Sequence, residues 1–83
     1  MLYLAEFYLA AGASLAEVVA RARAVRPGAV AAGPEVTLIQ AIFVPSDETC
    51  FALYRAGSAA AVCAAGAAAG LEFDRVTPAT AAL

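Results

Sequence analysis

The chain has 83 residues, a net charge of −2 and an isoelectric point near 4.8, and hydrophobic residues make up 64% of it. Its length suits one small domain, residues 1–83, and its positive charges are five scattered arginines, which excludes the basic patch of a nucleic-acid-binding domain. Its longest uncharged run, Ala56–Leu71, is shorter than the roughly 20 apolar residues of a membrane-spanning helix, so we expect neither nucleic acid nor a membrane as a partner.

The first element is predicted to be a strand. Residues Leu2–Leu9 include three aromatic side chains among leucines and are followed by Ala-Ala-Gly, a pattern typical of a strand that ends in a turn. The apolar segment Met1–Ser14 has no basic start, and Glu6 interrupts it, which argues against a signal peptide. We therefore expect a cytoplasmic protein in which Cys50 and Cys63 are reduced, buried and inert, with a regulatory or ligand-contacting thiol as the alternative.

A helix is predicted to begin at Ser14. Ser14 and Glu17 form a capping box, in which each side chain accepts a hydrogen bond from the backbone amide of the other residue. Apolar residues then recur at helical spacing on one face: Leu15, Val18, Val19, Ala22 and Val25. Pro27 and Gly28 are predicted to end the helix, and Pro27–Pro34 is predicted to be a connector of small residues.

Two strands joined by a tight turn are predicted next. Along Val36–Val44, simple alternation gives one face with these residues: Val36, Leu38, Gln40, Ile42 and Val44. In the turn that follows, Pro45 presets φ and Asp47 can bond its own backbone. Extended structure resumes over Thr49–Arg55, so we expect a hairpin.

A second helix and a fourth strand complete the chain. Ser58 is the predicted N-cap of an alanine-rich helix that ends at Gly70. Gly66 in its middle costs up to about 1 kcal/mol relative to alanine, which indicates a close approach to the helix at this point. The last strand is predicted over Leu71–Thr80, and Pro78 restricts it to an edge of the sheet or to a strand end.

The order βαββαβ predicts an α+β fold, a ferredoxin-like sandwich with a four-stranded antiparallel sheet and two helices on one face. The other face is uncovered, yet the strands carry apolar residues on both sides. Because a monomer rarely exposes an apolar patch above a few hundred Å², we expect a homodimer resembling a dimeric α/β barrel. A cavity between the sheets, or between sheet and helices, is then the natural site for a small apolar ligand.

Short motifs along most of the chain carry a family resemblance. They are Glu6 in the first strand, Tyr-Arg-Ala at 54–56, Ala-Gly-Leu at 69–71 and Asp-Arg-Val at 74–76. The chain resembles a family of small ferredoxin-like bacterial proteins of unknown function that is often labelled nickel-binding. The resemblance implies the same fold and, as its nominal role, divalent metal binding.

The metal ligands of that family are not matched. Its pattern has a histidine in the second strand and a cysteine two residues before the tyrosine of the third, where this chain has Gln40 and Ala52. A shift of one residue would instead place Cys50 or Phe51 near the position of the cysteine. A chain without histidine lacks the commonest nickel ligand, so we expect no metal site and no cofactor.

The predicted ligand contacts are four polar residues, Glu6, Gln40, Tyr54 and Arg75. A carboxylate within an apolar central strand needs a partner or a raised pKa, so Glu6 is either a functional acid or half of an ion pair with Arg55 or Arg75. No catalytic residue is predicted, because the histidine that would activate either cysteine is absent.

Three functions are compatible with these features. We favour a non-enzymatic homodimeric module that binds a small ligand or another protein. The second hypothesis is a small cofactor-free enzyme, oxygenase-like or isomerase-like, that acts on an apolar substrate, and it depends on analogy of fold. The third is the divalent metal binding implied by the family resemblance.

Overall fold

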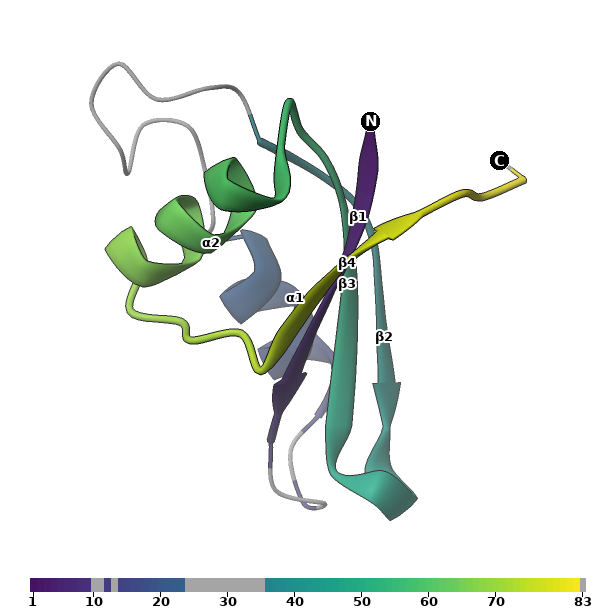
Figure 1. Cartoon of the computed structure of the whole chain (residues 1–83). Helices are drawn as coiled ribbons and strands as arrows, with labels where there is room; N and C mark the ends of the chain where they lie inside the picture. The colour runs from purple at the N-terminus through teal and green to yellow at the C-terminus, as the bar shows by residue number, and fades with distance from the viewer. Residues whose placement is uncertain (10–11, 13, 24–35, 83) are drawn as a thin grey trace.

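A computed structural model describes residues 1–9, 12, 14–23 and 36–82 of the chain (Figure 1). The elements, in chain order, are β1 (Leu2–Tyr8), α1 (Leu15–Arg23), β2 (Thr37–Val44), the 3₁₀ helix η2 (Pro45–Asp47), β3 (Thr49–Arg55), α2 (Ala59–Ala68) and β4 (Arg75–Ala79). The predicted end of the first helix and the connector Pro27–Pro34 lie outside the described residues.

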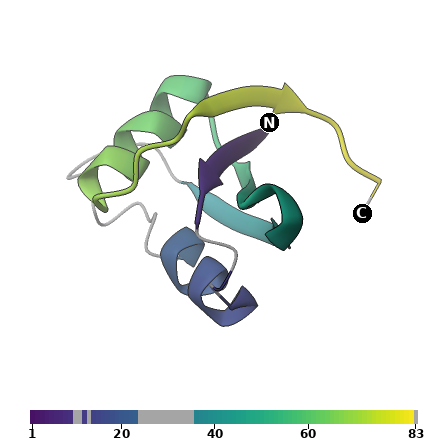
Figure 2. The same ribbon diagram turned by 90° about the horizontal axis from the view of Figure 1, so that it is seen from below.

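The four strands form one antiparallel sheet in the order β2-β3-β1-β4. β1 is central and pairs with β3 from Leu2, opposite Arg55, to Tyr8, opposite Thr49. Both helices lie on the same face of the sheet and leave the other face open (Figures 1 and 2). The predicted ferredoxin-like α+β sandwich is therefore confirmed.

The core lies between the helices and the covered face of the sheet. Its strand residues alternate along the two central strands: Tyr3, Ala5 and Phe7 from β1, and Cys50, Ala52 and Tyr54 from β3. Its helix residues are smaller: Val18 and Ala22 from α1, and Ala61, Val62 and Ala65 from α2. No helix in the described part of the chain is long and apolar enough to cross a membrane.

The alternation predicted along β2 is wrong in its first half. The pairing with β3 shifts between Leu38 and Gln40, so Ile39 is an extra residue that forms a bulge. Leu38 therefore lies opposite Tyr54 and packs against the core, whereas Gln40 lies opposite Leu53 on the open face. Because side chains alternate with a period of two, one inserted residue moves the residues before it to the other face.

The predicted helix starts are present. The Ser14 hydroxyl accepts a hydrogen bond from the Glu17 amide at 3.2 Å. In α2 the Ser58 hydroxyl accepts one from the Ala61 amide at 3.1 Å. These bonds satisfy amide groups that have no partner within the first turn of a helix.

The end of α2 also follows the sequence prediction. Gly70 adopts φ 76°, a left-handed conformation that side chains disfavour. Its amide donates to the Ala67 carbonyl at 3.1 Å, and the Leu71 amide donates to the Gly66 carbonyl at 2.8 Å. This pair of bonds is a Schellman motif, which turns the chain back toward the sheet.

β4 is shorter than predicted, because residues 71–74 connect α2 to the sheet instead of extending the strand. In this connection Phe73 packs its ring against two core aromatics, with centroid distances of 6.1 Å to Phe7 and 6.0 Å to Tyr54. Pro78 lies in an edge strand as predicted, since β4 pairs with β1 on one side and ends the sheet on the other.

Gly66 allows α2 to lie close to this connection. A Cβ atom at Gly66 would stand 2.5 Å from Cε2 of Phe73 and 2.9 Å from the backbone oxygen of Leu71. Both distances are shorter than normal van der Waals contact, and the oxygen belongs to Leu71, whose amide forms one of the two bonds of the Schellman motif. The close approach predicted from the sequence is confirmed.

We expect Gly66→Ala to lower the free energy of unfolding by about 1–2 kcal/mol, because overpacking outweighs the gain in helix propensity. The matched control is Gly57→Ala, whose added Cβ would meet nothing within 4 Å. Urea denaturation measures both variants. An unchanged or higher stability of Gly66→Ala would contradict the packing described for Phe73.

Candidate functional site

The open face is the side of the sheet that neither helix covers, and its side chains stand in rows across the strands. One row across its middle contains Gln40, Leu53, Leu4 and Thr77, and the next contains Ile42, Phe51, Glu6 and Arg75. The row at one end contains Thr37, Arg55, Leu2 and Ala79, and the row at the other end contains Val44, Thr49 and Tyr8.

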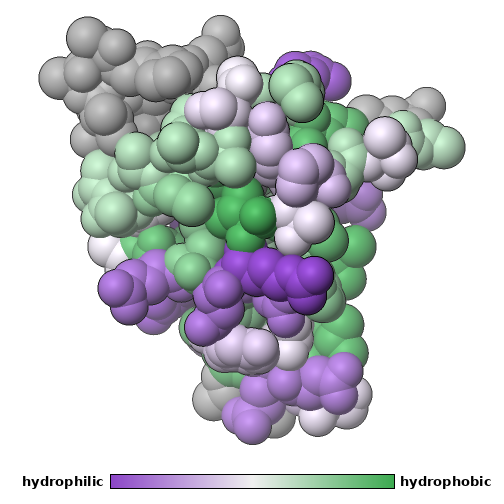
Figure 3. All heavy atoms as spheres, viewed as in Figure 1, coloured by the Kyte–Doolittle hydropathy of each residue, from purple (hydrophilic) through white to green (hydrophobic). Residues whose placement is uncertain are grey.

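The centre of the open face is apolar. Leu4 and Phe51 on the two central strands are half-buried and Leu53 is only 9% exposed, whereas Ile42 on the edge strand β2 remains 48% exposed. Figure 3 shows hydrophobic side chains along the right-hand side of the molecule, where the open face is seen edge-on. A second apolar surface thus lies outside the core.

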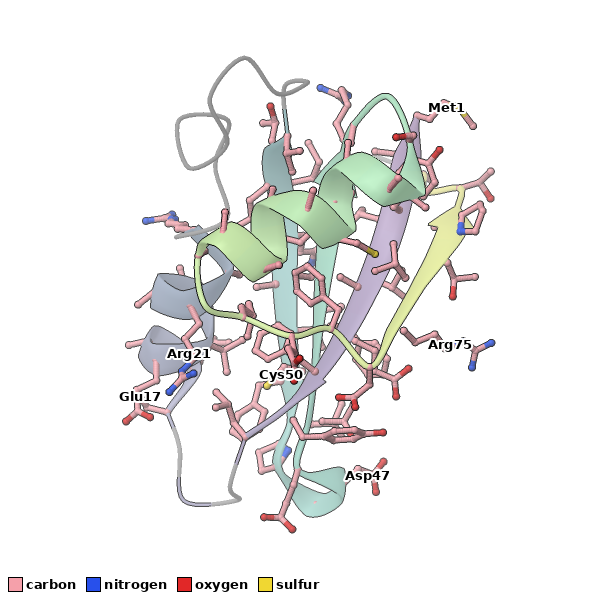
Figure 4. The ribbon with its side chains drawn as sticks, turned by 60° about the vertical axis from the view of Figure 1, so that its left-hand side comes forward. Met1, Glu17, Arg21, Asp47, Cys50 and Arg75 are labelled. Atoms are coloured by element: carbon pink, nitrogen blue, oxygen red, sulfur yellow. The ribbon has the colours of Figure 1, made fainter. Side chains whose placement is uncertain are left out.

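Three of the four predicted ligand contacts share the open face. Arg75 is directly opposite Glu6 in the pairing of β1 with β4, but these two side chains do not form the ion pair considered from the sequence. Gln40 lies in the neighbouring row on β2, across the sheet from both. The Arg75 side chain points outward from β4, away from the body of the molecule (Figure 4).

Tyr54 does not join these three residues, because it lies on the covered face. Its side chain is fully buried, and its hydroxyl donates a 2.8 Å hydrogen bond to the backbone oxygen of Ala22 in α1. Burial raises the pKa of the Tyr54 hydroxyl. In this structure Tyr54 holds α1 against the sheet and cannot contact a ligand on the open face.

Tyr8 is a neighbour of Glu6 that the sequence analysis did not select. Its hydroxyl donates to Oε1 of Glu6 at 3.4 Å, and the Asp74 amide donates to the Glu6 backbone oxygen at 2.8 Å. The Glu6 carboxylate, and to a lesser extent Asp74, raise the pKa of Tyr8. The spacing of two residues along a strand is the signal that could have paired Glu6 with Tyr8.

The cysteines differ in their surroundings. Cys50 is fully buried, and burial raises the pKa of its thiol although Arg21 acts in the opposite direction. Cys63 is exposed on the outer side of α2, so the prediction of two buried thiols is wrong for this residue. Across the described residues, no three His, Cys, Asp or Glu side chains form a group that could hold a metal ion.

Hollows that are open to solvent border the described part of the sheet. One of about 580 Å³ lies beside the end of β4, and another of about 300 Å³ lies beside the end of β3. Both are partly lined by Met1. A further hollow of about 360 Å³ lies at the opposite end of the sheet and is lined by Tyr8, Leu9, Asp47 and Glu48. Figure 4 shows Met1 and Asp47 at these two ends.

The protein is thus an α+β protein of ferredoxin-like fold with an uncovered apolar sheet face. No family model and no curated protein matches the chain. Its structure is similar to the crystal structure of SCO4226 from Streptomyces coelicolor A3(2), with a TM-score of 0.79 and 20% sequence identity over 100% of both chains. This likeness establishes the fold, and the resemblance to the nickel-labelled family stays a prediction.

The Glu6–Tyr8 contact gives a direct test of the charges on the open face. We expect Glu6→Gln to move the pKa of Tyr8 down toward its ordinary value, because removing the carboxylate removes the main charge that opposes tyrosinate. Asp74→Asn should lower it less, because Asp74 contributes less. Tyrosinate absorbance, taken as the difference from a Tyr8→Phe reference, reports this pKa. If Asp74→Asn lowered the pKa of Tyr8 more than Glu6→Gln does, the contact between Glu6 and Tyr8 would be contradicted.

A second test concerns the buried hydroxyl. Tyr54→Phe should lower the free energy of unfolding by about 1 kcal/mol at neutral pH, because the hydrogen bond to Ala22 is lost. The folded wild-type protein keeps the Tyr54 proton at pH values where the unfolded chain releases it, so folding loses stability as the pH rises above about 10. Urea denaturation should therefore show that the free energies of unfolding of the wild type and of Tyr54→Phe become more similar above that pH. A difference that stays constant would contradict a raised pKa.

Proposed function

We propose that the protein is a homodimeric module whose subunits pack open face to open face, and that it binds a small ligand at the end of this surface. The observation that carries the proposal is the apolar centre of the open face, formed by Leu4, Phe51 and Leu53 on strands that the helices already cover from the other side. A sheet that is apolar on both faces is typical of one that is covered on both faces.

The size of the open face supports the same conclusion. Four strands spaced about 4.8 Å apart, each five to eight residues long, present a surface on the order of 400 Å² in projection. This area includes polar residues such as Gln40, Glu6 and Arg75, so the apolar part is a patch of the size that often marks an interaction site on a protein surface. A second sheet packed on it would remove its exposed apolar side chains, such as Ile42, from water, which stabilises the pair by about 25 cal/mol per Å² of apolar surface buried.

The charges on this face favour a second copy as the partner. The central rows contain one acid and one base, Glu6 and Arg75, side by side. In a twofold-symmetric pair each surface meets itself, so a face of one sign would repel its copy, whereas this face offers each charge a counterpart. Covering Glu6 without such a counterpart would be unfavourable.

The catalytic and metal-binding alternatives have weaker support. Glu6 does have a tyrosine neighbour, but Tyr8 is 57% exposed and lies in the end row of the open face, not in an enclosed pocket. Tyr54 is separated from Glu6 by the sheet. Metal binding would need a donor group, and the described part of the chain contains no cluster of three suitable side chains.

The dimer is tested with two exposed hydrophobic residues of similar exposure. Ile42 on the open face is 48% exposed and Leu15 on α1 is 56% exposed, so lysine at either position should be tolerated by a single chain. We expect a wild-type dimer at micromolar concentration. Ile42→Lys should weaken it at least tenfold because the interface would bury the new charge. Leu15→Lys should leave it unchanged.

Light scattering coupled to size-exclusion chromatography and native mass spectrometry measure the oligomeric state, and circular dichroism checks that each variant is folded. A wild-type chain that is monomeric at all concentrations would refute the dimer. If both lysine variants weakened the dimer equally, the open face would not be the interface.

A further inference from the structure

Two hollows of opposite character adjoin at one end of the open face. The larger, of about 580 Å³, is mostly apolar and is lined by Met1, Leu2, Pro78, Ala79, Thr80 and Ala81. The smaller, of about 300 Å³, is lined by Met1, Thr37, Arg55 and Ala56. Met1 is common to both, and the row that contains Thr37, Arg55, Leu2 and Ala79 runs from one hollow to the other.

The shared wall is held in place by two contacts. The Met1 backbone oxygen accepts a hydrogen bond from the Ala56 amide at 2.9 Å, which ties the start of β1 to the end of β3. The Tyr3 hydroxyl donates to the Met1 sulfur at 3.7 Å. These contacts hold Met1, which both hollows share, beside the end of β3, while Thr80 and Ala81 of the larger hollow follow the end of β4.

Arg55 supplies the charge of the smaller hollow. It is exposed at the end of β3, and its neighbours in the row, Thr37 and Leu2, are uncharged. A guanidinium group can bind a carboxylate through two parallel hydrogen bonds, and the Thr37 hydroxyl can donate a third. The plane of the guanidinium matches the plane of a carboxylate, which makes a carboxylate a suitable head group for this hollow.

We propose that the two hollows form one site for a small apolar molecule with a carboxylate head group. The carboxylate binds Arg55 and Thr37, and the apolar part lies in the larger hollow against Leu2, Pro78 and Ala79. This inference depends on the ligand-binding part of the proposed function and does not depend on the dimer. None of the four ligand contacts predicted from the sequence lines either hollow.

Isothermal titration calorimetry tests the site with three probes at constant ionic strength: octanoate, octanol and acetate. Octanoate should bind at least tenfold more tightly than the other two, because it alone fills both hollows. In Arg55→Gln the affinity for octanoate should fall to that for octanol, while the affinity for octanol stays the same. Arg55→Lys should be intermediate, since it keeps the charge and loses the planar pair of donors.

The matched control is Arg21→Gln, which removes an exposed arginine from α1, on the covered side of the sheet, and should not change octanoate binding. Equal affinity for octanoate and octanol, or an Arg55→Gln variant that binds octanoate normally, would overturn the proposal. The same samples are examined by light scattering. A dimer that does not bind octanoate refutes the ligand and leaves the dimer, whereas a monomer that binds it refutes the dimer and leaves the ligand.

Discussion

The pairing of β1 with both β3 and β4 is the constraint on which the rest of the structure depends. It places β1 in the centre of the sheet, so that Tyr3, Ala5 and Phe7 enter the core while Leu4 and Glu6 face the other way. With both helices on one side, every alternate residue of the central strands is left uncovered. The apolar open face, the placement of Glu6 opposite Arg75 and the hollows at the end of this face all follow from this register.

Local signals in the sequence predicted the elements well because their causes are local. The caps at Ser14 and Ser58 and the left-handed Gly70 each depend on residues within one helical turn. The bulge at Ile39 has no such cause, because it is defined by how β2 aligns with β3. Nothing in the run of apolar residues around it marks the extra residue, so simple alternation assigned Leu38 to the wrong face.

The candidate site was predicted less completely than the fold, for a related reason. Glu6, Gln40 and Arg75 were selected as polar residues in apolar strands, and the register brings them to one face. Tyr54 met the same criterion, but its hydroxyl is satisfied by the carbonyl of Ala22, a contact between residues 32 positions apart that sequence spacing does not reveal. The hollow beside Arg55 is equally non-local, since it forms where strand ends from distant segments meet.

The composition of the helices links stability to association. A domain of this size buries only about 60–65% of the surface of its unfolded chain, and the core side of α2 is lined mainly by alanine. The aromatic cluster of Phe7, Tyr54 and Phe73 offsets part of this deficit and requires the glycine at position 66. In the dimer proposed above, apolar side chains that a single chain leaves exposed on the open face, such as Ile42, would add to the stability of the pair. For the proposed dimer, folding and dimerisation are linked, so the measured stability should rise with protein concentration.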